Sequence, residues 1–592
     1  MLVTLFGIST LCNDVHPLNA PLPRGKPQVR LGVIHPVESI WLRFGPNDQT
    51  DGYRKQLNEN FQNLTQWLLM GNVDFDFISE SLLPEQCAQG GAPLQVGQMA
   101  YDMILVPGCE TLRSTTLERL EQFYNAGGQL VFLGDAPKFV DAVESDRPGK
   151  LWAAAKHIQF AKNDILNAVE PIRTVRIVGK NQTLTENLMH QLRKDGEDLW
   201  LFVAHSEMPK NRDVPVCQKV TISLPGTYGV LRYDSQNGEI LPMQWENVDG
   251  KTVIKTELYD LDSLLLRYTA PENVTKSGET EQSAEQTLLP VPQLVAYRLD
   301  EPNVLLLDKA EYAFFGEAYA PETEILRADS ALRQRLGWPL RQESVAQPWS
   351  IAEKEAPKVV RLRYRVFSAE EFTDVRLALE EAENTKIFLN GQQITAKPQG
   401  WYVDKAIRSV LLGTLQKGEN VLELETPFSH RIGLEWCYLL GDFDVQVQGE
   451  YRRLTAKTGA LGFGDVTTQG LAHYGGNITY SIPVKTNGGK LTVTVPHYAG
   501  AGLRCALDGE EQYILYPPYR TQFAHLPAGE HLLEITLLGN RQNSFGPVHW
   551  ADLNNIWVNA NSWRTSGAAW TESYRLKELG ILSAPVIAET PL

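Results

Sequence analysis

The residues that could contact a ligand gather near the carboxy terminus. Trp550, Asp552, Asn561, Trp563 and Arg564 combine two indole rings with a carboxylate, an amide and a guanidinium. Indole rings stack on the C–H faces of sugars, while the polar groups hydrogen-bond hydroxyls. These five residues are therefore candidates for carbohydrate binding. The alternative is that the tryptophans belong to a core and that the polar groups stabilise a long loop.

A second set of polar residues lies near the amino terminus, after predicted strands. His35 and Glu38 follow the first strand, Glu80 follows the second, and Glu110 follows the third. Ligands of open parallel sheets bind outside the carboxyl ends of the strands, so these residues are candidates for lining such a crevice. The alternative is that they cap helices or line a contact between domains.

The sequence gives little support for a catalytic residue or a metal site. Cys109 follows the third strand, but the adjacent carboxylate of Glu110 raises a thiol pKa instead of lowering it, so we interpret Cys109 as a structural thiol. The six cysteines have no short spacing that would predict a zinc site or a disulfide framework. No pair of carboxylates stands out as acid and base. We therefore predict no catalytic residue, no metal and no cofactor.

Composition narrows the class of protein. A chain of 592 residues predicts roughly three to five domains. The net charge of −16 disfavours nucleic acid as a partner. No stretch is apolar over the roughly 20 residues of a membrane span, and the scattered cysteines favour a cytoplasmic location. Residues 1–27 lack the basic start of a signal peptide, so we expect an irregular extension, left where an upstream domain was lost.

Residues 28–172 are predicted to form an α/β domain. Its expected strands cover 29–34, 74–78, 102–106 and 129–133, and its expected helices cover 53–70 and the segment from Ser114, as its cap, to Gly127. Apolar strands that alternate with helices indicate a doubly wound parallel sheet. The pattern then changes to short alternating strands with turn signals, which predicts a β-sandwich over 173–270. A polar linker is expected over 271–290.

The second half of the sequence contains an internal repeat. Leu415–Leu424 (LQKGENVLEL) matches Leu526–Ile535 (LPAGEHLLEI), and each follows a strand that ends in a hairpin turn. The two copies are 111 residues apart, which is the length of one sandwich and too long for a solenoid repeat. We therefore predict two jelly rolls, over 291–450 and 451–592.

Several longer motifs together resemble one family of large bacterial glycoside hydrolases, those similar to the α-L-rhamnosidases of glycoside hydrolase family 106. The motifs are HPVES (35–39), DFDFISESLL (74–83), VPGCETL (106–112), GLEWCYLLGDF (433–443), YGGN (474–477), YPPY (516–519), GNR (539–541) and WRT (563–565). The resemblance implies that catalysis belongs to a (β/α)₈ barrel preceding the α/β domain. This chain is expected to start at the edge of that domain and to lack the barrel.

The resemblance also implies the identity of individual domains. The α/β domain resembles class I glutamine amidotransferases, whose nucleophile follows a strand. Here the comparable strand over 129–133 is followed by Gly134, Asp135 and Ala136, without a cysteine, so amidotransferase activity is not expected. The last two modules resemble galactose-binding-like domains, which bind sugars in some relatives and serve as scaffolds in others.

The sequence therefore predicts the non-catalytic carboxy-terminal portion of a glycoside hydrolase that acts in carbohydrate degradation. Its expected partners are a carbohydrate, either an oligosaccharide or a side chain of a plant polysaccharide, and a separate catalytic barrel. Neither nucleic acid nor a membrane is expected as a partner. Two alternatives stay open: a stand-alone carbohydrate-binding or scaffold protein, and an inactive, truncated gene product.

We expect a protease at low concentration to cut first within Pro271–Gln286, because a polar segment with almost no apolar side chains cannot bury itself. Limited proteolysis with mass spectrometry of the fragments measures this. A first cut within 300–450 would show that the predicted border between domains is misplaced.

Overall fold

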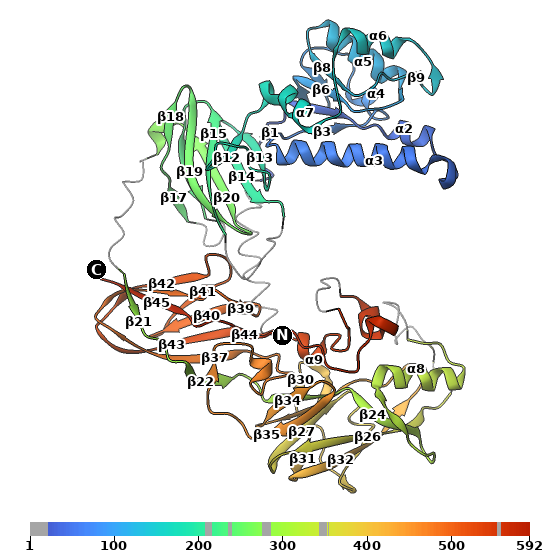
Figure 1. Ribbon diagram of the computed structural model, residues 1–592, viewed down its shortest axis with the longest axis vertical. Coiled ribbons are helices and arrows are strands. Elements are labelled where there is room, and N and C mark those ends of the chain that lie inside the picture. Colours follow the sequence, from blue (N-terminus) through green and yellow to red (C-terminus); the bar gives the residue numbers. More distant parts are fainter. Residues whose placement is uncertain are drawn as a thin grey trace. The chain divides into compact units, whose positions relative to one another are not determined.

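The computed structural model divides the chain into two compact units, one up to Gln282 and one from Ser283 onward (Figure 1). The structure describes residues 22–207, 216–234, 239–274, 286–341, 352, 355–552 and 558–591. Most of the predicted linker over 271–290 lies outside the described residues.

A five-stranded parallel sheet forms the first part of the unit up to Gln282. In spatial order its strands are β11 (Lys156–Ile158), β8 (Gln129–Leu133), β6 (Met103–Val106), β2 (Leu31–Ile34) and β3 (Asp76–Ile78). All neighbouring strands pair in parallel, which confirms the predicted parallel sheet. β2 and β6 are buried at every position, as expected for strands covered on both faces.

Helices cover both faces of this sheet (Figure 1). They are α2 (Val37–Leu42), α3 (Asn47–Met70), α4 (Leu83–Gln86), α5 (Ser114–Asn125), α6 (Arg147–Ala154) and α7 (Lys162–Val169). Along β6, Met103 and Leu105 belong to the core shared with α3 and α7. Ile104 and Val106 belong to the core shared with α5 and α6. The alternation of side chains along one strand therefore supplies two separate cores.

Two predicted helix starts differ from the structure. α3 begins at Asn47, directly after Pro46 and earlier than predicted. The sequence pattern does not reveal its first turns, because they are polar and carry no apolar periodicity. Ser114 was predicted to cap α5, but it is the first helical residue, and Arg113 is the N-cap residue. The carboxylate of Asp141 accepts the backbone N–H of Ser114 at 3.0 Å instead. This cap comes from a distant loop, which local sequence could not indicate.

Two larger antiparallel sheets of this unit share one core, which confirms the predicted change to β structure. Small sheets join β7 (Thr111–Leu112) with β9 (Phe139–Val140) and β10 (Val143–Glu144), and β4 (Leu94–Val96) with β5 (Met99–Tyr101). The first larger sheet has the order β1 (Lys26–Pro27), β13 (Leu188–Asp195), β14 (Asp198–His205), β20 (Ser263–Thr269), β16 (Gly229–Tyr233), β17 (Ile240–Pro242). The second has the order β12 (Arg176–Gly179), β15 (Cys217–Pro225), β19 (Lys251–Tyr259), β18 (Glu246–Val248). The buried side chain of Asn72 links the two parts, since it accepts the N–H of Ile177 at 3.0 Å.

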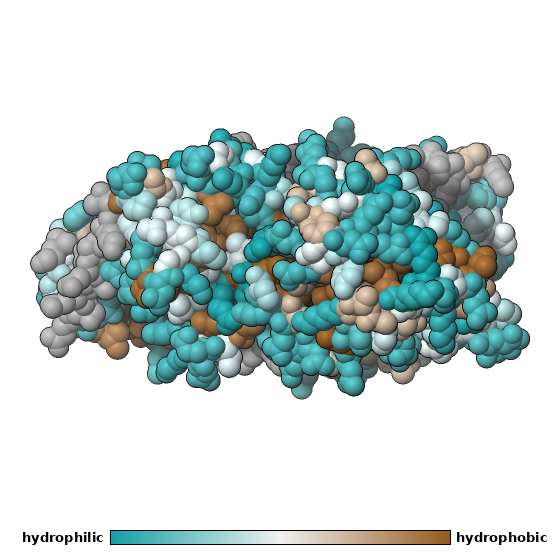
Figure 2. All heavy atoms as spheres, turned by 90° about the horizontal axis from the view of Figure 1, so that it is seen from above, coloured by the Kyte–Doolittle hydropathy of each residue, from teal (hydrophilic) through white to brown (hydrophobic). Residues whose placement is uncertain are grey.

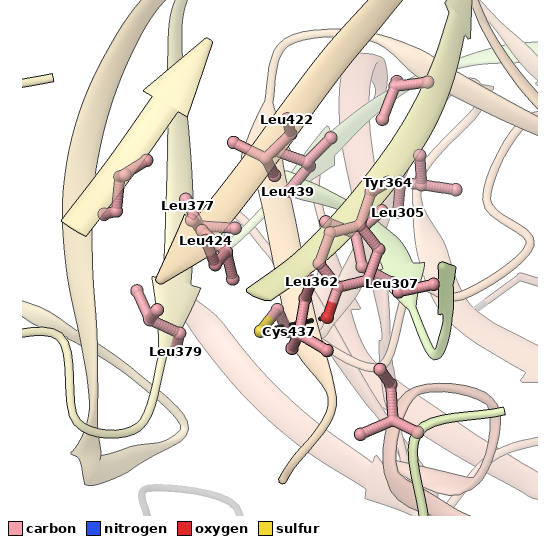
Figure 3. Close-up of a cluster of buried hydrophobic side chains, with 14 of the residues drawn as sticks. Leu305, Leu307, Leu362, Tyr364, Leu377, Leu379, Leu422, Leu424, Cys437 and Leu439 are labelled. Atoms are coloured by element: carbon pink, nitrogen blue, oxygen red, sulfur yellow. Dashed lines mark hydrogen bonds between the residues drawn. The ribbon is translucent and has the colours of Figure 1, made fainter. Parts of the chain in front are cut away.

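The unit from Ser283 onward contains what we call the inserted β-module, which is made of β23 to β35. One sheet has the order β23 (Asn303–Leu307), β33 (Cys437–Gly441), β27 (Phe372–Leu379), β31 (Asp404–Leu415), β30 (Trp401–Tyr402). The other has the order β25 (Ala320–Glu324), β24 (Lys309–Phe314), β26 (Lys358–Ser368), β32 (Gly418–Phe428), β28 (Lys386–Leu389), β29 (Gln392–Ile394). β35 (Tyr451–Thr455) bridges to β26 and pairs with β34 (Asp444–Gln448). Figure 3 shows leucines of both sheets meeting in the shared core.

The rest of this unit forms the outer β-module, which is made of β21, β22 and β36 to β45. One sheet has the order β21 (Thr287–Leu289), β45 (Val586–Thr590), β38 (Gly489–Thr494), β42 (Arg520–Leu526). The other has the order β36 (Leu461–Gly462), β22 (Leu294–Leu299), β37 (Ile478–Thr486), β43 (Gly529–Leu538), β40 (Gly502–Leu507), β41 (Glu510–Ile514). A short pair, β39 (Tyr498–Ala499) and β44 (Gly580–Ile581), lies beside them.

The sequence repeat corresponds to a repeat in topology. The order β26–β32–β28–β29 in the inserted β-module matches β37–β43–β40–β41 in the outer one. Both hairpins turn through two residues with positive φ, Asn390 and Gly391 in one and Asp508 and Gly509 in the other. Asn-Gly and Asp-Gly favour this turn because glycine and the short polar residues tolerate it.

The two β-modules are not consecutive along the chain. β21 and β22 precede the inserted β-module, yet they pair with β45, β36 and β37 of the outer one. The predicted border at 450 therefore separates segments that the sheets join. Residues 540–579, between β43 and β44, in turn contribute Val548 and Tyr574 to a core with Val304, Leu306 and Tyr438 of the inserted β-module.

The surface is mostly polar on the face shown in Figure 2, where hydrophobic side chains are scattered between hydrophilic ones. Single exposed aromatic residues such as Phe44 and Tyr451 are common on protein surfaces. None of the helices in the described part of the chain combines the length and the apolar character needed to cross a membrane.

Candidate functional site

Trp550 and Trp563 belong to a cluster of four tryptophans. Together with Trp436 and Trp570 they surround a space too small to admit a water molecule. All four side chains are half-buried. Trp550 and Trp563 are thus packed in this cluster, close to Val548 and Tyr574, which share a core with the inserted β-module.

Glu324 lines the same space and was not found from the sequence. It is buried at the start of α8 (Ile325–Leu336), where its carboxylate accepts the N–H groups of Leu326 and Arg327, both at 3.1 Å. It also accepts the indole N–H of Trp436 at 2.7 Å. Burial raises the pKa of Glu324 to about 7. Its role is to fix the helix and the ring of Trp436 together.

A buried carboxylate, Asp308, holds the 540–579 segment in place. It accepts hydrogen bonds from Arg452 at 2.6 Å and from the hydroxyl of Tyr574 at 2.7 Å. Its other oxygen lies 2.6 Å from Nε2 of His549, whose Nδ1 lies 2.9 Å from the carbonyl oxygen of Thr571. Burial acts to raise the pKa of Asp308, but His549, Arg452 and Tyr574 outweigh it and hold that pKa well below its ordinary value.

An open groove of about 490 Å³ lies next to the tryptophan cluster. It is lined by Asn540, Arg541, Gln542, Phe545, Gly546, Val558, Trp563, Lys577 and Glu578. Trp563 lines both the groove and the closed space. Its indole N–H donates to the carbonyl oxygen of Phe545 at 3.0 Å, which fixes the orientation of the ring.

The polar wall of the groove is also held rigidly. Arg541 forms a bidentate pair with the carboxylate of Glu301, with one N–O distance of 2.9 Å. The side chain of Asn543 accepts the backbone N–H of Lys577 at 2.9 Å and donates to its carbonyl oxygen at 2.7 Å. A fixed indole beside amide, guanidinium, ammonium and carboxylate groups suits a ligand that carries hydroxyls and apolar C–H surface.

The structure brings only one of the five carboxy-terminal candidates into the groove. Trp563 lines it, whereas Trp550 lines only the closed space. Asp552 and Asn561 are exposed. Arg564 is half-buried, and burial together with the nearby charge of Arg341 lowers its pKa. Four further residues that line the groove were not among the sequence candidates: Arg541, Gln542, Lys577 and Glu578. Arg541 does belong to the motif GNR (539–541).

Among the amino-terminal candidates, the carboxylates pair with arginines and backbone N–H groups. Glu38 accepts Nε of Arg113 at 2.8 Å, and Glu80 accepts the backbone N–H of Arg113 at 2.7 Å. Glu110 forms a bidentate pair with Arg43 at 2.7 and 3.0 Å. His35 is not part of this group, since it packs against Phe61 and Phe77 at ring distances of 5.1 and 6.0 Å. The contacts favour helix capping and loop bracing for these carboxylates.

Burial raises the pKa of one of these carboxylates, Glu80, and of the nearby Cys109 thiol. Glu80 is fully buried, and burial raises its pKa to about 7. Burial also raises the pKa of the Cys109 thiol well above its usual range, with Glu80 and Glu38 acting in the same direction. A thiol held in its neutral form is a poor nucleophile, in agreement with a structural Cys109. Within the described ranges, no group of three His, Cys, Asp or Glu side chains could hold a metal ion.

No protein-family model and no curated protein matches this sequence. Solved structures match at low similarity. A rhamnosidase from Novosphingobium sp. PP1Y matches at 14% identity with a TM-score of 0.29, over 60% of this chain and 32% of that one. α-L-Fucosidase isoenzyme 2 from Paenibacillus thiaminolyticus matches at 9% identity with a TM-score of 0.28, over 43% and 51%.

A β-galactosidase from Bacillus circulans sp. alkalophilus matches at 11% identity with a TM-score of 0.30, over 43% of this chain and 44% of that one. The chain thus spans between a third and a half of the length of these three proteins. Each of these TM-scores lies below 0.5.

We expect the substitution Glu80→Gln to stabilise the protein more at pH 8 than at pH 5. The pKa of Glu80 is about 7 in the folded state and near 4.5 otherwise, so the wild type loses stability as the pH rises from 4.5 to 7. The difference amounts to at most about 3 kcal/mol. Calorimetric unfolding at both pH values measures it, with the exposed Glu85→Gln as the control. An equal offset from the wild type at both pH values would contradict the raised pKa.

We expect Asp308→Asn to destabilise the unit from Ser283 onward by about 3–5 kcal/mol, because the guanidinium of Arg452 would remain buried without its counter-charge and His549 would lose the carboxylate that it contacts. Denaturant unfolding measures the loss. Asp442→Asn is the matched control, since Asp442 is exposed and pairs with Lys457 at the surface. Equal effects of the two substitutions would show that the Asp308 network does not hold the segment.

Proposed function

We propose that this chain is a carbohydrate-binding, non-catalytic portion of a glycoside hydrolase of the α-L-rhamnosidase type, which acts in carbohydrate degradation. The observation that carries the proposal is the groove of about 490 Å³ beside Trp563. Its rigid indole and its polar wall suit the C–H faces and the hydroxyls of an oligosaccharide. In this proposal both β-modules are galactose-binding-like jelly rolls, and the groove is where the 540–579 segment serves as a binding surface.

The proposal gives the α/β domain a scaffold role with a glutamine-amidotransferase-like fold. Two observations support this role. β8 is followed by Gly134, Asp135 and Ala136 instead of a nucleophile. Cys109, the cysteine nearest to the polar groups, is buried in a core, and the pKa of its thiol is raised. The catalytic step then belongs to a barrel outside this chain.

A second candidate is a stand-alone carbohydrate-binding protein. It is favoured by the position of the groove, whose lining residues all belong to the unit from Ser283 onward. The groove therefore needs no contribution from another chain to bind a glycan. Adding a separately produced barrel distinguishes the candidates, because only the first predicts that the two chains associate.

We expect the wild-type chain to bind at least one oligosaccharide at millimolar concentration, and Trp563→Ala to weaken that binding at least about tenfold, since the stacking face is lost. Glu578→Ala tests the polar wall, because Glu578 is exposed and lines the groove. Titration calorimetry after a glycan-array screen measures both.

The control for Trp563→Ala is Trp401→Ala, which removes a tryptophan that is 46% exposed and lies outside the groove. Thermal unfolding of each variant separates lost binding from lost folding. A wild-type chain that binds no oligosaccharide would contradict the proposal. Turnover of an aryl glycoside by the pure chain, abolished by one carboxylate substitution, would contradict its non-catalytic part.

A further inference from the structure

A second cavity, of about 610 Å³, opens into the inserted β-module between its two sheets. It is lined by Arg341, Pro357, Leu362, Leu379, Glu380, Glu381, Leu424, Thr426, Arg431, Ile432, Gly433, Leu434, Glu435 and Cys437. Its floor belongs to the hydrophobic core: Leu362 and Leu424 come from one sheet, and Leu379 and Cys437 from the other (Figure 3). The cavity therefore reaches from a charged rim down to an apolar floor.

The apolar character of the floor includes the cysteine. Cys437 is only 4% exposed, and burial raises the pKa of its thiol to about 12. The thiol is therefore neutral at physiological pH and behaves as a small apolar group. Its sulfur lies 3.9 Å from the hydroxyl of Tyr364, the contact drawn in Figure 3.

One rim residue, Arg341, is held in a fixed position. Its guanidinium pairs with the carboxylate of Glu435 and lies 3.7 Å from Oδ1 of Asp329. A Cβ atom on Gly433 would overlap Nη1 of Arg341, so a side chain there would displace the guanidinium. The pair of Arg341 and Glu435 is thus oriented before any ligand arrives.

The wall that carries Glu435 is anchored from below by α8. Asp329 and Arg333 are both buried and pair with each other at 2.8 Å. Asp329 accepts the backbone N–H of Leu434 at 3.0 Å, and Arg333 donates to the carbonyl oxygen of Ser429 at 3.2 Å. A buried ion pair that serves a surface loop in this way gives the cavity a rigid wall.

The mixture of charges on the rim selects a neutral ligand. Three glutamates (Glu380, Glu381 and Glu435) and two arginines (Arg341 and Arg431) are among the residues that line the cavity. An anionic ligand would meet the carboxylates, and a cationic one would meet the guanidinium groups. Adjacent hydroxyl groups of a neutral ligand suit the carboxylates and the guanidinium groups alike, since each hydroxyl can donate to a carboxylate and accept from a guanidinium. The floor requires C–H or methyl surface on the other side of the ligand.

We propose that this cavity is a second carbohydrate site, which binds one neutral sugar residue with its hydroxyls on the charged rim and an apolar face on the leucine floor. The choice of a sugar among neutral polyols rests on the proposed function, whereas the site itself rests on different residues from those of the Trp563 groove.

The test is a titration of the full chain that carries Trp563→Ala, which removes the groove's stacking face. The probes are neutral methyl hexosides and methyl 6-deoxyhexosides, a hexuronic acid and a hexosamine, followed by saturation-transfer NMR and calorimetry. Two pocket variants are added to this background. Glu435→Gln removes one charge but keeps an acceptor. Glu380→Trp fills the mouth of the cavity from an exposed position at the end of β27.

We expect the Trp563→Ala chain to bind a neutral sugar at millimolar concentration. Glu435→Gln should weaken this binding at least about tenfold, as expected for a lost charge-assisted hydrogen bond, and Glu380→Trp should abolish it. Glu383→Gln, an exposed glutamate outside the cavity, should leave it unchanged. Thermal unfolding checks that each variant is folded.

Three results would overturn the second site. No neutral sugar binds, or both pocket variants leave the affinity unchanged, or the hexuronic acid or the hexosamine binds more tightly than the neutral sugars. If the wild type binds oligosaccharides and Trp563→Ala abolishes all binding, the proposed function stands and the second site fails. If the pocket variants abolish sugar binding and Trp563→Ala changes nothing, the second site stands and the groove fails.

Discussion

The buried carboxylate of Asp308 is the contact on which the unit from Ser283 onward depends. Its partners Arg452, His549 and Tyr574 lie 144, 241 and 266 positions further along the chain. A buried charge without its partners costs several kcal/mol, so the network is stable only when all of these segments are in place. The groove, and the tryptophan cluster apart from Trp436 and Glu324, are lined by residues that follow β43, the part of the chain to which His549 and Tyr574 belong, and their geometry therefore depends on this contact.

The position of Trp563 between a closed cluster and an open groove has a physical advantage. Packing on one side and the hydrogen bond to Phe545 hold the ring still, so little side-chain entropy remains to be lost when a ligand stacks on it. A freely exposed tryptophan would offer more surface but a less ordered one. Half-burial of Trp563 is thus compatible with ligand binding. Counting aromatic residues in the sequence identified this part of the chain, but it could not show which side of the Trp563 ring is packed.

Local patterns predicted much of the fold. The apolar runs at 29–34 and 102–106 gave buried parallel strands, and Asn390-Gly391 and Asp508-Gly509 gave the hairpins of the repeat. Pairings between distant segments could not be predicted, because no local signal links β22 to β37 or Asp308 to His549. The candidate site followed the same rule. Trp563 was found from composition, whereas Lys577 joins the groove only through the fold.

The insertion of one β-module into the other sets the order in which the chain can fold. Leu299 on β22 pairs with Ile478 on β37. The first strands of the outer β-module therefore cannot pair until the whole inserted β-module has been synthesised. Closing so long a loop is entropically costly and slow unless something shortens it. A folded inserted β-module does so, by bringing its two ends near each other. Emergence from the ribosome would then favour the core between the two sheets of the inserted β-module first. The outer β-module would close around its ends, and the Asp308 network would form when His549 and Tyr574 emerge.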